Sequence, residues 1–206
     1  MKAGGGHAKG ADFERSVCKY LSHWWTDGAR EDIFWRTPQS GGRATRRKQK
    51  GLATANHYGD ILATDLIGTP LLKFMILELK CGYGSASIMD LIDSGIKSLW
   101  RRWIDSAERV REEAGSRVWG LIVHRPGKKT VICYPRLLRL LLGGDMKRSM
   151  LIFHGEGESG GIEMTRLDDF IETIRPAQII DLMRMRLSEL REHLQSGKSD
   201  AEKSCD

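Results

Sequence analysis

The residues of this sequence that could do chemistry together are Asp60, Glu78 and Lys80. Asp60 follows Gly59, and seventeen residues separate it from Glu78-Leu79-Lys80. Because side chains alternate along a β-strand, Glu78 and Lys80 project from one face of the strand predicted over 73–80. If this strand pairs with the one predicted over 58–63, Asp60 reaches the same face. Two carboxylates and one ammonium group then meet at the end of an apolar sheet.

Such a pair of carboxylates favours a hard divalent cation, Mg²⁺ with Mn²⁺ as a substitute, over zinc. The main-chain carbonyl of Leu79 offers a further oxygen ligand. The cation would activate a water molecule and neutralise charge on a phosphodiester, and Lys80 would orient that water or stabilise the developing charge. Short Asp…Glu-x-Lys matches also arise by chance. The alternative is therefore a surface ion pair between Glu78 and Lys80 beside an ordinary loop acid, Asp60.

The predicted elements around these residues are a helix and two strands. The helix over 10–25 is amphipathic and places Glu14 at the edge of its buried stripe. Gly68-Thr69-Pro70 supplies turn chemistry for a hairpin between the strands over 58–63 and 73–80. The second strand is apolar on both faces until its end, which is typical of a sheet covered on both sides.

Hydrophobic periodicity predicts further elements in the rest of the chain. They are a strand over 33–36, a long helix over 87–114, strands over 118–124 and 130–134, a helix over 136–142, a hairpin of 150–153 with 162–165, and helices over 168–174 and 176–194. This order predicts one α/β sandwich with a central mixed β-sheet flanked by helices. The predicted divisions are a flexible leader over 1–9, one domain over 10–175, a C-terminal helix over 176–195 and a disordered tail over 196–206.

Basic residues gather in one stretch of the chain. The 206 residues carry a net charge of +6, and no acidic residue lies between Asp32 and Asp60. Such a block attracts polyanions and indicates a DNA-binding surface, although a solvated charged loop has the same composition. The basic residues of this stretch are Arg36, Arg43, Arg46, Arg47, Lys48 and Lys50.

Composition also excludes several classes of protein. No apolar run approaches the roughly 18 residues that span a bilayer, and the N-terminus lacks the apolar segment of a secretory signal. We therefore expect a cytoplasmic protein without a membrane partner. The four cysteines form no CxxC pair, which favours reduced thiols over a disulfide framework or a zinc site. The six tryptophans are expected to pack in the core rather than to stack on unpaired bases.

Six stretches of the sequence match the motifs of one family, in order. They are Lys9-Gly10-Ala11-Asp12-Phe13-Glu14-Arg15, Arg36 with Ser40-Gly41, Tyr58-Gly59-Asp60-Ile61-Leu62-Ala63, Leu77-Glu78-Leu79-Lys80, Val131-Ile132-Cys133-Tyr134-Pro135 and Arg166-Leu167-Asp168-Asp169-Phe170. Together they resemble the PD-(D/E)xK nuclease superfamily and, within it, the archaeal-type Holliday junction resolvases. The resemblance implies a restriction-endonuclease-like fold over 10–175. It also implies Mg²⁺-dependent hydrolysis of DNA by a homodimer that nicks both sides of a four-way junction.

The resemblance also assigns roles to single residues. It makes Asp60 and Glu78 metal ligands and Lys80 the catalytic lysine. Glu14 becomes a further carboxylate of the metal shell, and Ser40 an active-site loop residue near the scissile phosphate. The basic stretch that begins at Arg36 would hold the phosphate backbone of the DNA.

The sequence departs from the resolvase pattern in three places. Gly59 stands where the family has proline, the stretch between Arg36 and Asp60 is longer than in a compact resolvase, and the C-terminal helix is additional. These departures bear on the substrate more than on the hydrolysis. Two alternatives therefore stay open: a restriction-type or repair nuclease acting on duplex, flap or nicked DNA, and a non-catalytic DNA-binding module.

Overall fold

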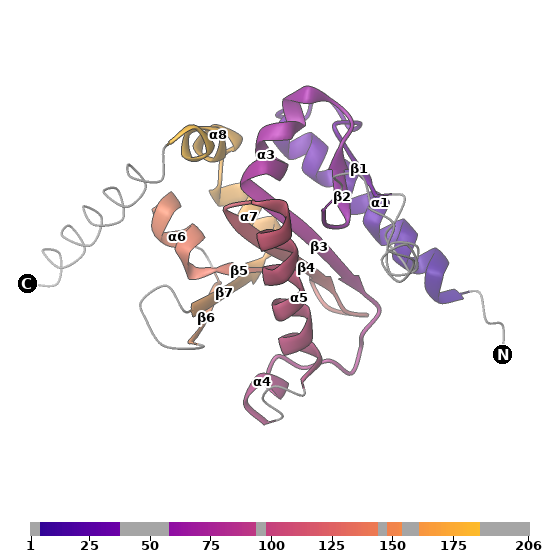
Figure 1. Cartoon of the computed structure of the whole chain (residues 1–206). Helices are drawn as coiled ribbons and strands as arrows, with labels where there is room; N and C mark the ends of the chain where they lie inside the picture. The colour runs from indigo at the N-terminus through magenta and orange to yellow at the C-terminus, as the bar shows by residue number, and fades with distance from the viewer. Residues whose placement is uncertain (1–4, 38–57, 94–97, 144–147, 154–160, 186–206) are drawn as a thin grey trace, which may run out of the picture.

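The computed structural model describes residues 5–37, 58–93, 98–143, 148–153 and 161–185. Over these residues a mixed β-sheet lies between helices on both faces (Figure 1). The sequence predicted this α/β class and the central mixed sheet, and the structure confirms both.

The sheet has five strands in the order β3-β4-β5-β7-β6. β3 and β4 are parallel, with Met75 opposite Val118, and the other neighbouring pairs are antiparallel. A parallel pair needs a crossover connection, which helix α5 provides here. β3 lies at the edge of the sheet. The strand bounds are β3 Met75–Cys81, β4 Val118–His124, β5 Val131–Pro135, β6 Met150–Phe153 and β7 Gly161–Arg166.

The helices divide unequally between the two faces of the sheet. One face is covered by α1 (Gly5–Trp25), α3 (Thr69–Phe74), α6 (Arg136–Leu142), α7 (Leu167–Thr173) and α8 (Pro176–Arg184). The other face is covered by α5 (Leu99–Ala114), with the short α4 (Asp90–Asp93) beside it. Figure 1 shows α5 crossing in front of the sheet.

Alternating side chains of the central strands fill two hydrophobic cores. On β4, Val118 and Ile122 belong to the core under α1, whereas Trp119 and Leu121 belong to the core under α5. All four side chains are buried. A strand that is buried on both faces needs a nearly continuous apolar sequence, and β3 and β4 have one. The first charged residues of β3 are therefore displaced to its end.

The structure corrects the predicted hairpin between 58–63 and 73–80. β2 (Ile61–Ala63) pairs instead with β1 (Phe34–Arg36), and a 3-10 turn, η1 (Leu66–Gly68), leads directly into α3. Pro70 lies in the first turn of α3, where a proline costs no helical hydrogen bond. The Gly-Thr-Pro sequence thus begins a helix instead of closing a turn.

The predicted helix over 87–114 is also interrupted. Ser98 has extended backbone angles, and its hydroxyl accepts a hydrogen bond from the Arg101 amide at 3.0 Å, which caps the start of α5. Gly115 ends the same helix in a left-handed conformation. The described helical parts of the predicted segment are therefore α4 and α5.

Helix ends account for two more differences. α1 begins at Gly5, so residues 5–9 of the predicted leader are helical, since Ala8, Lys9 and Ala11 are good helix formers. α8 is described to Arg184, and the remainder of the predicted C-terminal helix lies outside the described residues. Among the described helices, none is long and apolar enough to span a lipid bilayer.

Candidate active site

The charged end of β3 carries Glu78 and Lys80. Both project to the side of the sheet covered by α5, two residues beyond the buried Ile76, while Leu77 and Leu79 point to the opposite core. The Lys80 Nζ atom lies 2.9 Å from Glu78 Oε2 and donates a hydrogen bond to it.

Asp60 is held against β3 by two backbone hydrogen bonds. Its amide donates to the Leu77 carbonyl at 2.8 Å, and its Oδ2 atom accepts from the Leu79 amide at 2.8 Å. The same Oδ2 atom lies 3.8 Å from Lys80 Nζ. The structure therefore brings Asp60, Glu78 and Lys80 together, as the sequence predicted, through the segment before β2 instead of a hairpin partner.

Gly59 makes this close approach possible. Its φ is +78°, and a Cβ atom at this position would lie 2.7 Å from the Leu77 carbonyl oxygen. Proline, which the family pattern has here, is locked near a φ of −65° and cannot adopt this conformation. Glycine is thus required by the local backbone and is more than a neutral replacement.

The site holds more negative charge than its single ammonium group neutralises. Burial raises the pKa of Asp60 to about 6, and the charge of Glu78 adds to this rise against the opposing effect of Lys80. Burial alone would lower the pKa of Lys80, but the Glu78 and Asp60 carboxylates outweigh it and raise that pKa. Lys80 is therefore a cation at neutral pH.

Glu14 approaches the site from α1 and is paired with Arg36. Arg36 Nε donates to Glu14 Oε2 at 2.7 Å, and the two side chains are 28% and 17% exposed. The charge of Glu14 also contributes to the raised pKa of Asp60. The sequence singled out both residues but missed their pairing. Arg36 lies on the same face of β1 as the buried Phe34, and this alternation was the available signal.

The other predicted contact residues are not described by the structure. Ser40, Arg43, Arg46, Arg47, Lys48 and Lys50 lie outside the described residues. Their assignment to the DNA surface stays a prediction from the sequence.

The chemistry of the site fits a hard divalent cation, although it is not a complete cage. Within the described ranges, no group of three His, Cys, Asp or Glu side chains forms a metal-binding set. Two carboxylates converge, those of Asp60 and Glu78, and burial, followed by repulsion from Glu78, raises the pKa of Asp60. A cation relieves such repulsion. Oxygen ligands of this kind suit Mg²⁺, which usually takes one or two carboxylates and keeps several waters.

One comparison with known proteins bears on this arrangement. A family model described as "Phage putative PDDEXK endonuclease" matches residues 5–181, from the start of α1 into α8. The chain belongs to this family of PD-(D/E)xK endonucleases. No significant match was found among curated proteins or among solved structures.

The matched span contains Glu14, Asp60, Glu78 and Lys80, so every charged residue described above lies inside it. The superfamily expected from the sequence is thereby confirmed, together with its nuclease class. A specific likeness to archaeal resolvases is not part of this match.

Proposed function

We propose that this chain is a metal-dependent endodeoxyribonuclease whose active site is formed by Asp60, Glu78 and Lys80 at the end of β3. The observation that carries the proposal is the convergence of two carboxylates on one ammonium group, with Lys80 Nζ at 2.9 Å from Glu78 and 3.8 Å from Asp60. An ordinary surface ion pair does not require a second carboxylate that is buried at the cost of a raised pKa.

Asp60 and Glu78, with the Leu79 carbonyl, would hold the cation, which we propose to be Mg²⁺ with Mn²⁺ as a substitute. The bound ion supplies a more acidic water and neutralises charge on the phosphodiester. Glu14 would complete the set of carboxylates from α1, and its Arg36 partner fixes its orientation.

Lys80 would act on the phosphate itself. Its ammonium group is fixed by Glu78 and remains charged, so it donates hydrogen bonds to a phosphate oxygen or orients the attacking water. The leaving oxygen takes its proton from solvent in this scheme. Asp60 keeps its orientation throughout because the Leu79 amide holds Oδ2.

The test is cleavage of DNA in Mg²⁺ by Asp60→Ala, Glu78→Ala and Lys80→Ala variants. Each variant is expected to lose cleavage while it still folds and binds DNA, since the site lies at a strand end outside both cores. Asp181→Ala, an exposed acid on α8, serves as the control and should cleave normally. If Glu78→Ala cuts as fast as the unaltered protein, the assignment of the site is wrong.

The finer proposal concerns the DNA substrate. Branched DNA cut by a homodimer, as in a resolvase, predicts paired symmetric nicks and a strong preference for a four-way junction. A restriction-type or repair nuclease would cut linear duplex, flap or nicked DNA at comparable rates. Mapping the cuts on these four substrates separates the two classes of enzyme. EDTA-insensitive DNA binding without cleavage would instead support the binding module.

A further inference from the structure

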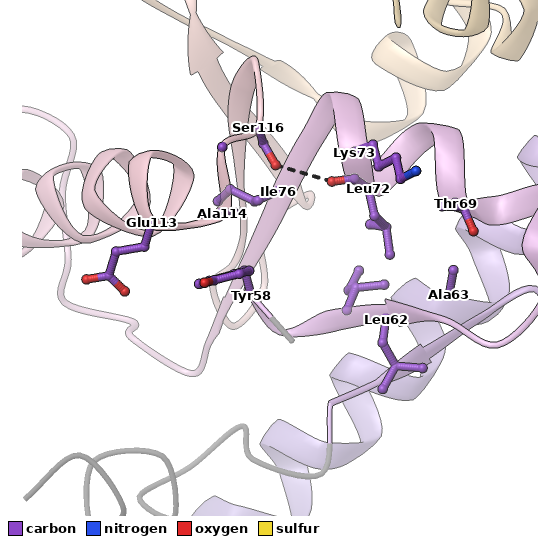
Figure 2. Close-up of a pocket in the computed structure, with 12 residues that line it drawn as sticks. Tyr58, Leu62, Ala63, Thr69, Leu72, Lys73, Ile76, Glu113, Ala114 and Ser116 are labelled. Atoms are coloured by element: carbon purple, nitrogen blue, oxygen red, sulfur yellow. Dashed lines mark hydrogen bonds between the residues drawn. The ribbon is translucent and has the colours of Figure 1, made fainter. Parts of the chain in front are cut away.

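A cavity of about 680 Å³ lies beside the start of β3 and has no role in the proposed chemistry. Its walls come from β2, α3, β3 and the C-terminal end of α5 (Figure 2). Ser116 Oγ donates to the Leu72 carbonyl at 3.3 Å and joins the end of α5 to α3 at the back of the cavity. Its size is within the range of small-ligand sites.

The cavity and the charged side chains of the candidate active site lie on the same face of β3. Ile76 lines it, and Glu78 projects from the same face two residues further on, about 6.6 Å along the strand. Tyr58 lines the cavity on the other side and precedes Asp60 by two residues. A DNA strand advances about 3.4 Å per nucleotide in a duplex and more when it is unstacked, so a nucleotide within about two of a phosphate at Glu78 reaches the cavity.

Tyr58 gives the cavity an aromatic surface at its mouth. Its side chain is 39% exposed, and Figure 2 shows its ring between Glu113 of α5 and Leu62 of β2. Leu62 and Leu72 add apolar wall, whereas Thr69, Ser116 and Glu113 add hydrogen-bonding groups. An open hollow that combines apolar side chains, hydrogen-bonding groups and one aromatic ring is suited to a nucleobase, which has a flat face and a polar edge.

A second exposed tyrosine lies at the opposite end of the site. Tyr83 follows Lys80 by three residues, is 42% exposed and packs edge-on against Trp103 with ring centroids 4.8 Å apart. Exposed tyrosines therefore lie on both sides of Asp60, Glu78 and Lys80.

We propose that the cavity beside β3 binds an unpaired nucleobase next to the scissile phosphate, with the base stacked on Tyr58. This inference rests on the proposed nuclease function and names its substrate class: DNA with unpaired nucleotides at the cut, as at a bubble, flap or junction. A fully paired duplex keeps its bases stacked inside the helix and must lose that stacking before it can fill the cavity.

The experiment compares cleavage of two duplexes that are identical except for a short mismatched bubble at the cut site. The unaltered protein is expected to cut the bubble faster. Tyr58→Ala should lower the ratio of the two rates about tenfold, which is the size of one lost base–aromatic stacking contact. Tyr58→Phe should keep the ratio. Because the readout is a ratio, a general loss of activity through displacement of Asp60 cancels.

Two further variants make the comparison specific. Ala114→Trp fills the cavity from α5, away from Asp60, and should lower the ratio as Tyr58→Ala does. Tyr20→Ala is the matched control: Tyr20 is 38% exposed on α1, its hydroxyl bonds to Asp168, and it does not line the cavity. The inference is overturned if the unaltered protein cuts both duplexes equally, or if Tyr58→Ala and Ala114→Trp leave the ratio unchanged.

Binding of a single-stranded oligonucleotide in EDTA separates failure of this inference from failure of the nuclease proposal. Tyr58→Ala should bind it about tenfold more weakly than Tyr20→Ala does. If the protein cleaves both duplexes and the two variants bind the oligonucleotide equally, the base-binding role of the cavity is rejected and the nuclease proposal stands. If the protein cleaves neither duplex but the two variants differ about tenfold in oligonucleotide binding, the nuclease proposal is rejected and the base-binding role of the cavity stands.

Discussion

At the scale of residues, the site concentrates charge that the fold itself does not need. Asp60 is 18% exposed in its side chain, and its carboxylate is held by one amide and faces both Glu78 and Lys80. The charged form is disfavoured by burial and by Glu78, which is why the pKa of Asp60 is raised to about 6. Proteins tolerate such groups chiefly where function uses them. Asp60 should therefore lower the stability of the ion-free protein.

Replacing Asp60 with asparagine should stabilise the protein while removing its activity. The carboxyl group is neutral in the folded and unfolded states well below pH 4, and charged in both well above pH 6. The cost of the buried charge is thus fully present well above pH 6 and vanishes on acidification through pH 4. In EDTA, Asp60→Asn should raise the free energy of unfolding by roughly 2–3 kcal/mol at pH 8 and by little at pH 4. Urea unfolding at both pH values measures this difference, and an equal effect at both would contradict it.

Lys80 and a divalent cation compete for the same carboxylates. The ammonium group is 2.9 Å from Glu78 Oε2, an oxygen that the cation would also use. Lys80→Gln should therefore abolish cleavage but bind Mg²⁺ more tightly, because one positive charge is removed from the site. Isothermal titration with Mg²⁺ gives the affinity. Weaker Mg²⁺ binding by Lys80→Gln than by the unaltered protein would show that the ion does not use Glu78.

At the scale of elements, the sequence predicted which segments carry the site but not how they connect. The type and order of the central strands followed from apolar runs bounded by turn residues, as for β3 and β4. The partner of β2 did not follow, because pairing is decided by long-range contacts that local periodicity does not contain. Proline is common both in turns and in the first turn of a helix. For Pro70 the sequence alone favoured a turn, whereas the residue lies in the first turn of α3.

The same distinction holds for the site. The alternation of Glu78 and Lys80 on one strand face was predictable from their spacing alone. Asp60 lies beside Glu78 and Lys80 for a reason that the sequence did not show, namely its hydrogen bonds to Leu77 and Leu79 of the edge strand β3. The role proposed for Tyr58 could not be predicted, because an aromatic residue before a strand has no periodic signal.

Gly59 gives a direct test of how the segment before β2 positions the site. Gly59→Ala combines a positive φ of +78° with a Cβ atom 2.7 Å from the Leu77 carbonyl, so Asp60 must move away from β3. We expect a loss of more than about 2 kcal/mol in unfolding free energy and a large fall in cleavage rate. Gly28→Ala is the control, since Gly28 has a φ of +83° but no atom within 4 Å of the added Cβ. Equal effects of the two substitutions on cleavage would refute the role of the close approach.

At the scale of the whole molecule, the site lies at one edge of a sheet that both cores hold together. α8 belongs to this body as described: Ile179 and Leu182 are buried in the core under α1. Arg117, at the start of β4, donates hydrogen bonds to the carbonyls of Leu182 and Met185 at the end of α8. α8 packs against α3, which leads into the start of β3, whereas Glu78 and Lys80 lie in the second half of that strand.

The contribution of the basic stretch to DNA binding can be separated from the contribution of the protein's net charge. If the basic stretch contacts phosphates, each lost contact lowers the slope of log affinity against log salt by about 0.9. Arg46→Gln with Arg47→Gln should thus lower the slope by about 1.8 in duplex DNA and weaken binding at low salt. Arg175→Gln with Arg184→Gln removes the same charge at the two ends of α8, outside the basic stretch, and should leave the slope nearly unchanged. Fluorescence anisotropy over a salt series measures both, and equal slopes for the two double variants would assign the binding to net charge instead of to the basic stretch.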